Sequence, residues 1–277
     1  MPLRHLALAA LQLPDPHAKA KAALALLAAA RAGQIEIDAQ AVIAEPAGLP
    51  GRPARPALVP ATQVPQRSPF TPAGRGALLH AIAHIEFNAI NLALDAIWRF
   101  AGMPNKYYLD WAQVAGEEAL HFSLLTEHLR SLGVAYGDFD AHDGLWRMTD
   151  ATKADLTARM ALVPRTLEAR GLDATPPMQA KLAKAGDQRA VAILDIILRD
   201  EIGHVAIGNH WYRWLCARDG LEPEALYPLL VTRYAAPRLR PPFNEVARRQ
   251  AGFSEREIAE LTGVTQTQAP SSGSAKP

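Results

Sequence analysis

Two Glu-x-x-His pairs stand out among the residues that could do chemistry, Glu118/His121 and Glu201/His204. Residues three apart on an α-helix share a face. A carboxylate oxygen and an imidazole nitrogen of one pair can therefore reach the same cation. In both places the polar residues interrupt an apolar stripe that would otherwise be buried. Either pair alone is a weak signal, because glutamate and histidine are ordinary residues on helix surfaces.

Single glutamates precede the two pairs at matching distances. Glu86 lies 32 residues before Glu118, and Glu168 lies 33 residues before Glu201. The stripe around Glu168 is less regular than the one around Glu86. Each half of this region therefore predicts a helix with one glutamate, followed by a helix with Glu-x-x-His. Glu86 interrupts an apolar stripe with helical spacing, formed by Leu79, Ile82, Ala83, Ile90, Ala93, Leu94 and Ile97.

Together these residues supply four carboxylates and two imidazoles, the ligand set of di-iron and di-manganese carboxylate proteins. Four carboxylates offset the charge of two divalent ions, and open positions remain for oxygen or substrate. Two buried Glu–His ion pairs without metal are the alternative, but six converging polar groups would be costly without a cation. We therefore predict a site for two iron ions, or manganese, held by Glu86, Glu118, His121, Glu168, Glu201 and His204.

Signals for helix starts and stops indicate the elements that must position these residues. We predict long helices over 72–100, 104–131, 149–171 and 187–218, with a short helix after Pro176-Pro177. Thr71-Pro72 suits the start of the first helix, and a glycine lies at or just after the end of each. Pro164 should kink the third helix. Strand signals are lacking, so the expected fold class is all-α, built on a four-helix bundle.

The expected bundle, residues 72–220, lies between two other kinds of sequence. Residues 1–45 form an N-terminal helical region, and the prolines of 46–71 predict an extended strap rather than helix or inner strand. Residues 221–263 predict shorter C-terminal helices packed on the bundle, where Ser254 and Glu257 have the spacing of a capping box. Residues 264–277, rich in Gln, Ser, Thr and Pro, predict a disordered tail.

Composition excludes several function classes. The 277 residues carry 29 Lys and Arg against 28 Asp and Glu, a net charge of +1. This balance argues against a protein that coats nucleic acid. A single cysteine, Cys216, excludes a disulfide within the chain and a Cys-rich metal site. The longest apolar runs, such as 22–30, are shorter than the roughly 20 residues that cross a bilayer. We therefore expect a cytoplasmic protein without membrane contact.

Over about residues 70–260 the chain resembles the ferritin-like superfamily. More narrowly it resembles an uncharacterised bacterial branch, a domain of unknown function, and it is distantly similar to the di-metal tRNA hydroxylase that modifies methylthio-isopentenyl-adenosine. The resemblance implies a di-iron-type centre held by the six residues named above, without implying a substrate. The motifs that carry it are His84-Ile85-Glu86 with Ala89-Ile90, Leu162-Val163-Pro164-Arg165, Leu167-Glu168-Ala169-Arg170-Gly171 and Asp200-Glu201-Ile202-Gly203-His204.

Three further residues are candidates for places beside the metals. Glu117 and Asp200 each precede a predicted ligand. In the similar desaturase-type sites an acid at this position holds the opposite imidazole, while the alternative is solvated surface charge. His84 shares a helix face with His80 and could contact a metal or substrate, although an ordinary hydrogen bond between helices explains it as well.

The function expected from these features is an oxygen-activating di-iron oxidoreductase that oxidises or hydroxylates an organic substrate. The substrate is either a small molecule or an RNA. Arginines in 233–249 and 52–67 could form a basic surface for RNA, or be scattered solvated charges. Electrons would come from an external donor, because no flavin or rubredoxin-type motif is present, and a homodimer is possible. Alternatives are a ferroxidase or other metal-handling protein, a di-manganese catalase-like enzyme, and a non-catalytic bundle that binds a partner through the strap.

Overall fold

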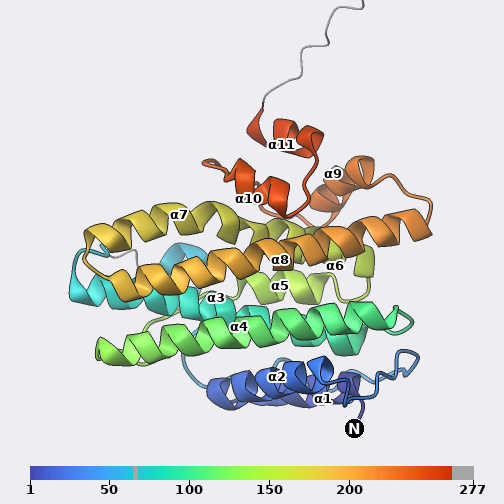
Figure 1. Ribbon diagram of the computed structural model, residues 1–277, viewed down its shortest axis with the longest axis horizontal. Coiled ribbons are helices and arrows are strands. Elements are labelled where there is room, and N and C mark those ends of the chain that lie inside the picture. The colour runs from blue at the N-terminus through green and yellow to red at the C-terminus, as the bar shows by residue number, and fades with distance from the viewer. Residues whose placement is uncertain (65–67, 264–277) are drawn as a thin grey trace, which may run out of the picture.

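The computed structural model describes residues 1–64 and 68–263 of the chain (Figure 1). These residues form an all-helical fold, and no β-strand occurs among them. One isolated parallel bridge joins Leu58 to Ala141. The tail expected over 264–277 lies outside the described residues.

Helices α3 (Pro72–Arg99) and α4 (Asn105–Ser131) confirm the first two long helices expected from the sequence. The Thr71 side chain accepts a hydrogen bond from the Gly74 N–H, and Pro72 occupies the first turn. The turns after both helices use glycine in the left-handed region, with φ of 78° at Gly102 and 74° at Gly133. The two helices pack side by side along most of their length (Figure 1).

The third long helix is not the one expected over 149–171. Instead α5 (Gly144–Ala151) and α6 (Leu156–Leu162) are followed by a π-helix, η2 (Val163–Glu168), and by α7 (Ala169–Lys184). Asp155 caps α6 by accepting from the Ala158 N–H. Pro164 lacks an N–H for the helix ladder, and the turns widen there without ending the helix. Gly171 and Pro176-Pro177 lie inside α7, so neither a stop at Gly171 nor a separate short helix is correct.

Helix α8 (Gln188–Arg218) confirms the fourth long helix. Asp187 caps it by accepting from the Ala190 N–H, and its carboxylate also lies 2.9 Å from Nε2 of His128 near the end of α4. This contact fixes the start of α8 against the end of α4. Helix α8 packs against α4, α6, η2 and α7, so it adjoins most of the elements that carry predicted ligands.

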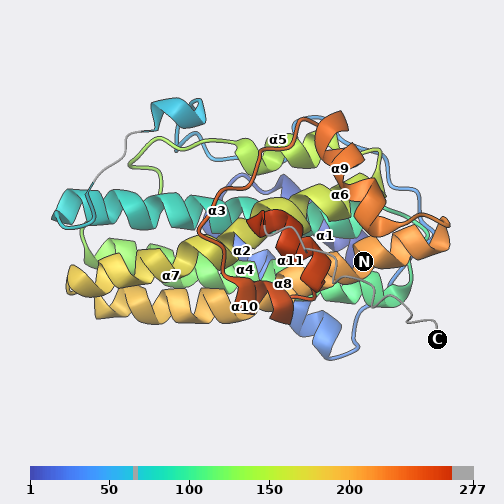
Figure 2. The same cartoon turned by 90° about the horizontal axis from the view of Figure 1, so that it is seen from above.

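Shorter helices cover the two outer sides of this arrangement. Helices α1 (Leu3–Gln12) and α2 (Pro16–Arg31) pack on α3 and α4, as Figure 1 shows. Helices α9 (Pro223–Arg233), α10 (Glu245–Gln250) and α11 (Glu255–Thr262) lie over α6, α7 and α8 (Figure 2). The capping box expected at Ser254 and Glu257 is present at the start of α11.

The described part of the proline-rich stretch is irregular apart from a short 3₁₀ turn, η1 (Ala61–Gln63). Part of it is fastened to the helices through Lys19 of α2, which is fully buried. Its Nζ donates to the Gly51 carbonyl at 2.7 Å and to Oδ1 of Asn91 on α3 at 2.5 Å. Burial, and then the charge of Arg52, lowers the pKa of Lys19 to about 7. A buried amine thus joins α2, the strap and α3.

Helix α3 is the most apolar of the long helices. In the part of the chain that the structure describes, it alone is long and apolar enough to cross a membrane, with a mean hydropathy of 1.3 over its most apolar window. Polar residues such as His84 and Glu86 interrupt the apolar residues of α3, so a search for uninterrupted apolar runs does not single this helix out. Of that window, 78% is buried inside the protein, as in the core helix of a globular fold.

Candidate metal centre

The six predicted ligands come from four helical segments that face one another. Glu86 lies on α3, Glu118 and His121 lie on α4, Glu168 ends η2, and Glu201 and His204 lie on α8. All six side chains are buried, with at most 7% of any residue exposed. Burial of so many ionisable groups in one region is costly unless they are paired or bind a cation.

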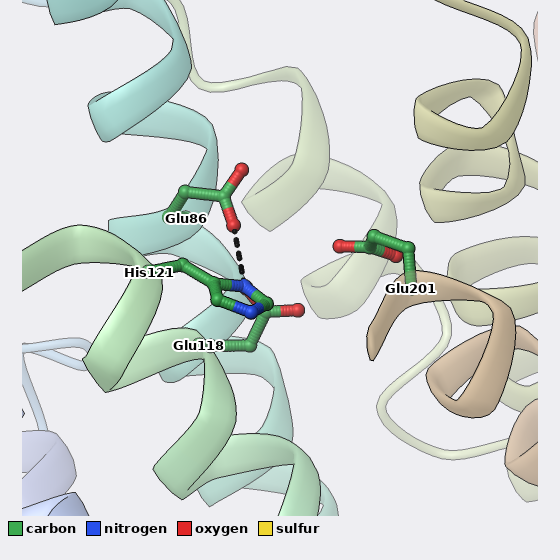
Figure 3. A group of neighbouring side chains, drawn as sticks. All are labelled: Glu86, Glu118, His121 and Glu201. Carbon is green, nitrogen blue, oxygen red and sulfur yellow. Dashed lines mark hydrogen bonds and ion pairs between the residues drawn. The ribbon is translucent and has the colours of Figure 1, made fainter. Parts of the chain in front are cut away.

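Four of the six form a compact group that could hold a metal ion. Glu86, Glu118, His121 and Glu201 each offer one ligand atom, and these atoms lie within 4.8 Å of one another. Figure 3 shows the carboxylates of Glu86 and Glu201 on opposite sides of the group, with Glu118 and His121 between and below them. Nδ1 of His121 lies 3.1 Å from Oε2 of Glu86 and 3.4 Å from Oε2 of Glu118.

His204, which lies one turn after Glu201 on α8, adjoins this group. Its Nδ1 lies 2.9 Å from Oε1 of Glu118 and 3.9 Å from Oε1 of Glu201. The two oxygens of Glu118 therefore face different imidazoles, Oε2 toward His121 and Oε1 toward His204. The ring centroids of the two histidines are 5.8 Å apart. Glu118 therefore connects the two imidazoles.

The outer nitrogen of each histidine is paired with an acid from the opposite helix. Nε2 of His121 on α4 lies 3.0 Å from Oδ2 of Asp200 on α8, and Nε2 of His204 on α8 lies 2.9 Å from Oε2 of Glu117 on α4. In a neutral imidazole, an Nε2–H donated to a carboxylate leaves the Nδ1 lone pair directed at the group, where a cation would take it. Each acid thus sets the tautomer of the opposite histidine.

These two acids have further partners that fix their position. Glu117 accepts from Gln113 at 3.1 Å and from Arg31 of α2 at 3.3 Å. Asp200 accepts from Arg199 at 2.8 Å. Of the two interpretations open for Glu117 and Asp200, contact with the opposite imidazole is the one that the structure displays.

Glu168 lies near enough to this group for its pKa to respond to the charges of Glu201, Glu118 and Glu86. Both of its carboxylate oxygens are buried, and in the described residues neither has a hydrogen-bond partner. Oε2 of Glu201 is in the same condition. A buried polar group without a hydrogen-bond partner costs roughly 1–3 kcal/mol, and a charged group costs more. These three oxygens therefore fit a site that a cation completes.

Burial and mutual repulsion raise the pKa of three of the glutamates. Desolvation by burial is the larger cause for Glu86, Glu168 and Glu201, followed for each by the charge of a neighbouring carboxylate. Burial also acts to raise the pKa of Glu118, but the two imidazoles beside it outweigh burial and lower its pKa. Without metal, Glu118 is therefore the carboxylate of the four that holds negative charge most readily.

The histidine pKa values shift in the opposite direction to the one that burial alone would give. Burial lowers the pKa of His121, but the hydrogen bond to Asp200 and those to Glu118 and Glu86 outweigh it, so the pKa is raised. Burial likewise lowers the pKa of His204, while the charge of Glu118 and the bond to Glu117 raise it. Burial acts to raise the pKa of Asp200, but the hydrogen bonds from His121 and Arg199 outweigh burial and lower this pKa to about 2. The metal-free group thus stores protons that a cation would displace.

His84 does not join this group. Its Nδ1 lies 2.9 Å from the hydroxyl of Tyr136 and its Nε2 lies 2.9 Å from Nδ2 of Asn88. Residues 84 and 86 are two apart on α3, so their side chains leave the helix in different directions. His84 instead lines a separate cavity of about 20 Å³ beneath the proline-rich strap, together with Arg52 and Tyr136.

The feature that sequence reasoning missed is the π-helix that carries Glu168. It brings Arg165 of η2 into contact with the C-terminal helices, where it pairs with Glu257 of α11. The signal was Pro164, which was interpreted as a kink. A proline in a helix does not by itself distinguish a kink from a widened turn, although π-helical insertions are frequent at functional sites.

The fold and site define an all-helical protein with a buried group of glutamates and histidines that could hold a metal ion. Residues 12–259 match the family described as "Protein of unknown function (DUF455)", and the chain belongs to that family. An uncharacterized protein of Haemophilus influenzae is 53% identical to it over 222 residues, which cover 78% of this chain and 77% of the relative. No solved structure matches the chain at a significant level.

Proposed function

We propose that this protein is a di-iron carboxylate oxidoreductase built on a ferritin-like four-helix bundle. The bundle would consist of α3, α4, the run from α6 through α7, and α8. Each of the four carries at least one of the six ligand residues in its buried middle part. Paired Glu-x-x-His helices alternate with helices that carry one glutamate, as in the di-iron and di-manganese carboxylate proteins.

The observation that carries this proposal is the crossed pairing of the histidines with the acids. Asp200 holds His121 and Glu117 holds His204, so the same arrangement occurs twice with α4 and α8 exchanged. A single contact of this kind would be enough for an ion pair that only stabilises the packing of two helices. Two imidazoles oriented alike, with Nδ1 facing a shared carboxylate at Glu118, are what a pair of metal ions requires.

The residues divide naturally between two ions. Glu86 and His121 would hold one ion, Glu168, Glu201 and His204 would hold the other, and Glu118 would contact both. Four carboxylates balance the charge of two divalent ions when the imidazoles are neutral. Carboxylates and imidazoles suit both iron and manganese, so the ligands alone do not choose between the two metals.

The chain's own residues would control charge and access at the centre. A reduced iron pair, when bound, supplies electrons to dioxygen. Glu168 and Glu201 have oxygens without partners among the described residues, so these oxygens could change how they contact the ions without breaking a hydrogen bond. Asp200 and Glu117 hold the imidazoles in place. The apolar side chains around the group exclude water. Electrons would come from a separate donor, since the one cysteine, Cys216, is buried and no thiolate redox motif exists.

Metal analysis of protein purified without oxygen tests this proposal. We expect two iron ions per chain in the wild type and an optical change when oxygen is added. The double variant Glu118→Ala with His204→Ala should lose most of the metal. Glu127→Ala is the matched control, because Glu127 lies on the same helix α4 but is exposed and pairs with Arg189, away from the predicted ligands. Full metal occupancy in the double variant would refute the site.

The complete burial of the six residues also supports a second function, oxidation of ferrous iron as a ferroxidase. A centre without an exposed ligand is accessible to ions and dioxygen more readily than to a large organic substrate. A ferroxidase would turn over many ferrous ions per chain and release or store ferric product. An oxidoreductase for an organic substrate would consume oxygen once per centre and then stop until a donor and a substrate are added.

A further inference from the structure

The position of Glu168 is set by its backbone, because its carboxylate has no hydrogen bond in the described part of the chain. The backbone there is the widened helix η2, whose geometry is less favourable than that of an α-helix. Within η2 the Thr166 hydroxyl donates to the Ala161 carbonyl at 2.7 Å. A segment of this kind needs contacts from neighbouring elements to hold its shape.

Arg165, three residues before Glu168, is held by the C-terminal helices. Its guanidinium is buried and pairs with Oε1 of Glu257 on α11. The same guanidinium lies 4.3 Å from the ring centroid of Tyr227 on α9 and 5.0 Å from that of Phe253. Cation–π contacts of this length are attractive, and more so away from water. The hydroxyl of Thr166 also lies 2.9 Å from that of Tyr227.

The residues that follow Glu168 are held by the same C-terminal segment. Arg248 on α10 is fully buried. Its Nη2 lies 2.6 Å from Oδ2 of Asp173 and 3.4 Å from the carbonyl oxygen of Ala169. The Arg248 guanidinium lies 5.1 Å from the ring of Phe253, the ring that Arg165 also contacts. Two guanidinium groups and one ring thus connect both flanks of Glu168 to residues 248–257.

Contacts other than the one with Arg165 also fix the side chain of Glu257. Its Oε2 accepts from the Ser254 N–H at 2.7 Å within the capping box and from Arg213 of α8 at 3.0 Å. The remaining oxygen, Oε1, is therefore aimed at Arg165. A buried ion pair stabilises a fold little compared with apolar packing of the same shape. The contact of Glu257 with Arg165 is directed and lies three residues before Glu168, so it points to a role of Glu257 in positioning Glu168.

We propose that Glu257 and Arg248 are positioning residues that hold Glu168 at the metal centre. This inference rests on the proposed function. Through Arg165 on one flank and Asp173 on the other, helices α10 and α11 keep η2 in the shape that directs Glu168 inward. Loss of the Glu257 contact releases η2 and weakens the ion that Glu168, Glu201 and His204 hold. The ion held by Glu86 and His121 stays bound.

Titration of metal-free full-length protein with ferrous iron and with cobalt(II), without oxygen, tests this. We expect two ions for the wild type and, in both Glu257→Gln and Glu168→Gln, one ion with unchanged affinity and a second weakened at least about tenfold, the range seen when partners of ligands are removed. The cobalt spectrum reports the geometry of the second ion separately. Glu255→Gln is the matched control, because Glu255 is an exposed neighbour on α11 that pairs with Arg249 and not with Arg165.

Circular dichroism and thermal unfolding of the metal-free variants separate loss of fold from loss of position. Arg248→Lys provides a second variant, which keeps the charge but cannot reach Ala169 and Asp173 together. Two tightly bound ions in a folded Glu257→Gln and in Arg248→Lys would overturn the positioning role and leave the metal centre intact. A wild type that binds no metal would overturn the proposed function and this inference together.

Discussion

Oε2 of Glu117 on α4 lies 2.9 Å from Nε2 of His204 on α8, although the two residues are 87 positions apart. The counterpart contact, Asp200 with His121, joins the same helices in the opposite sense. Each acid directly precedes a predicted ligand glutamate in the sequence. One turn of α4 or α8 therefore supplies both a predicted ligand and the acid that orients the histidine of the opposite helix. The register of α4 against α8 is therefore part of the site.

Removal of an orienting acid should weaken metal binding without removing a ligand. For Asp200→Asn and Glu117→Gln we expect metal affinity to fall by about 10- to 100-fold each, because the amide no longer selects the imidazole tautomer with Nδ1 free. Competition with a chelator of known affinity measures this. Asp195→Asn serves as the control, since Asp195 lies on α8 with an exposed contact to Gln179. Unchanged affinity in both acid variants would show that the imidazoles need no orientation.

Metal binding should release protons and should strengthen as pH rises. The pKa of Glu86 and that of Glu168 are raised by burial and by neighbouring carboxylates, so the folded metal-free protein keeps protons that the unfolded chain has lost near neutral pH. The stability contributed by these groups is thus present below the ordinary glutamate pKa and is lost as pH rises through the raised value. A cation must displace these protons. Calorimetric titration in buffers of different ionisation enthalpy measures the number released, and a value of zero would contradict this account.

The sequence predicted the parts of the site that depend on spacing along one helix. The Glu-x-x-His pairs and the single Glu86 follow from helical periodicity, and α3, α4 and α8 begin and end close to their capping and glycine signals. The crossing of Glu117 to His204 could not be derived from this periodicity, because it depends on how two helices are aligned. The resemblance to desaturase-type sites suggested it, and the alternative of solvated charge could be decided only with α4 and α8 placed together.

The run from α5 to α7 shows where local signals fail. Pro164, Gly171 and Pro176-Pro177 are ordinarily signs of a helix end, yet the helix continues through all of them from Leu156 to Lys184. The reason is tertiary. The widened turns at Pro164 pack against Gly208 of α8, where a Cβ atom would lie 2.6 Å from the proline ring. Contacts between distant segments are absent from any local pattern, so η2 and its C-terminal partners could not be predicted.

Replacement of Glu168 by an apolar residue of similar size should stabilise the metal-free protein. Both oxygens of Glu168 are buried without a partner among the described residues, so Glu168→Met removes a desolvation cost. We expect the free energy of unfolding of the metal-free form to rise by about 1–3 kcal/mol. Metal should stabilise the wild type strongly and the variant much less. Thermal or urea unfolding with and without iron measures both effects. A metal-free variant less stable than the wild type would mean that Glu168 has a structural partner.

Gly208 should be required for the shape of η2. An alanine Cβ at this position would lie 2.6 Å from Cβ and Cγ of Pro164, a rigid ring that cannot rotate away. Gly208→Ala should therefore destabilise the protein by about 1–3 kcal/mol as an overpacked contact, and it should also weaken metal binding, because the displaced segment carries Glu168.

Gly203→Ala on the same helix is the matched control. A Cβ there meets no atom within 4 Å, so the higher helix propensity of alanine should raise stability by up to about 1 kcal/mol. Unfolding curves and iron titrations of the two variants should therefore move in opposite directions for stability, and only Gly208→Ala should lose metal affinity. Equal metal affinity in both variants would show that the packing of Pro164 does not determine the position of Glu168.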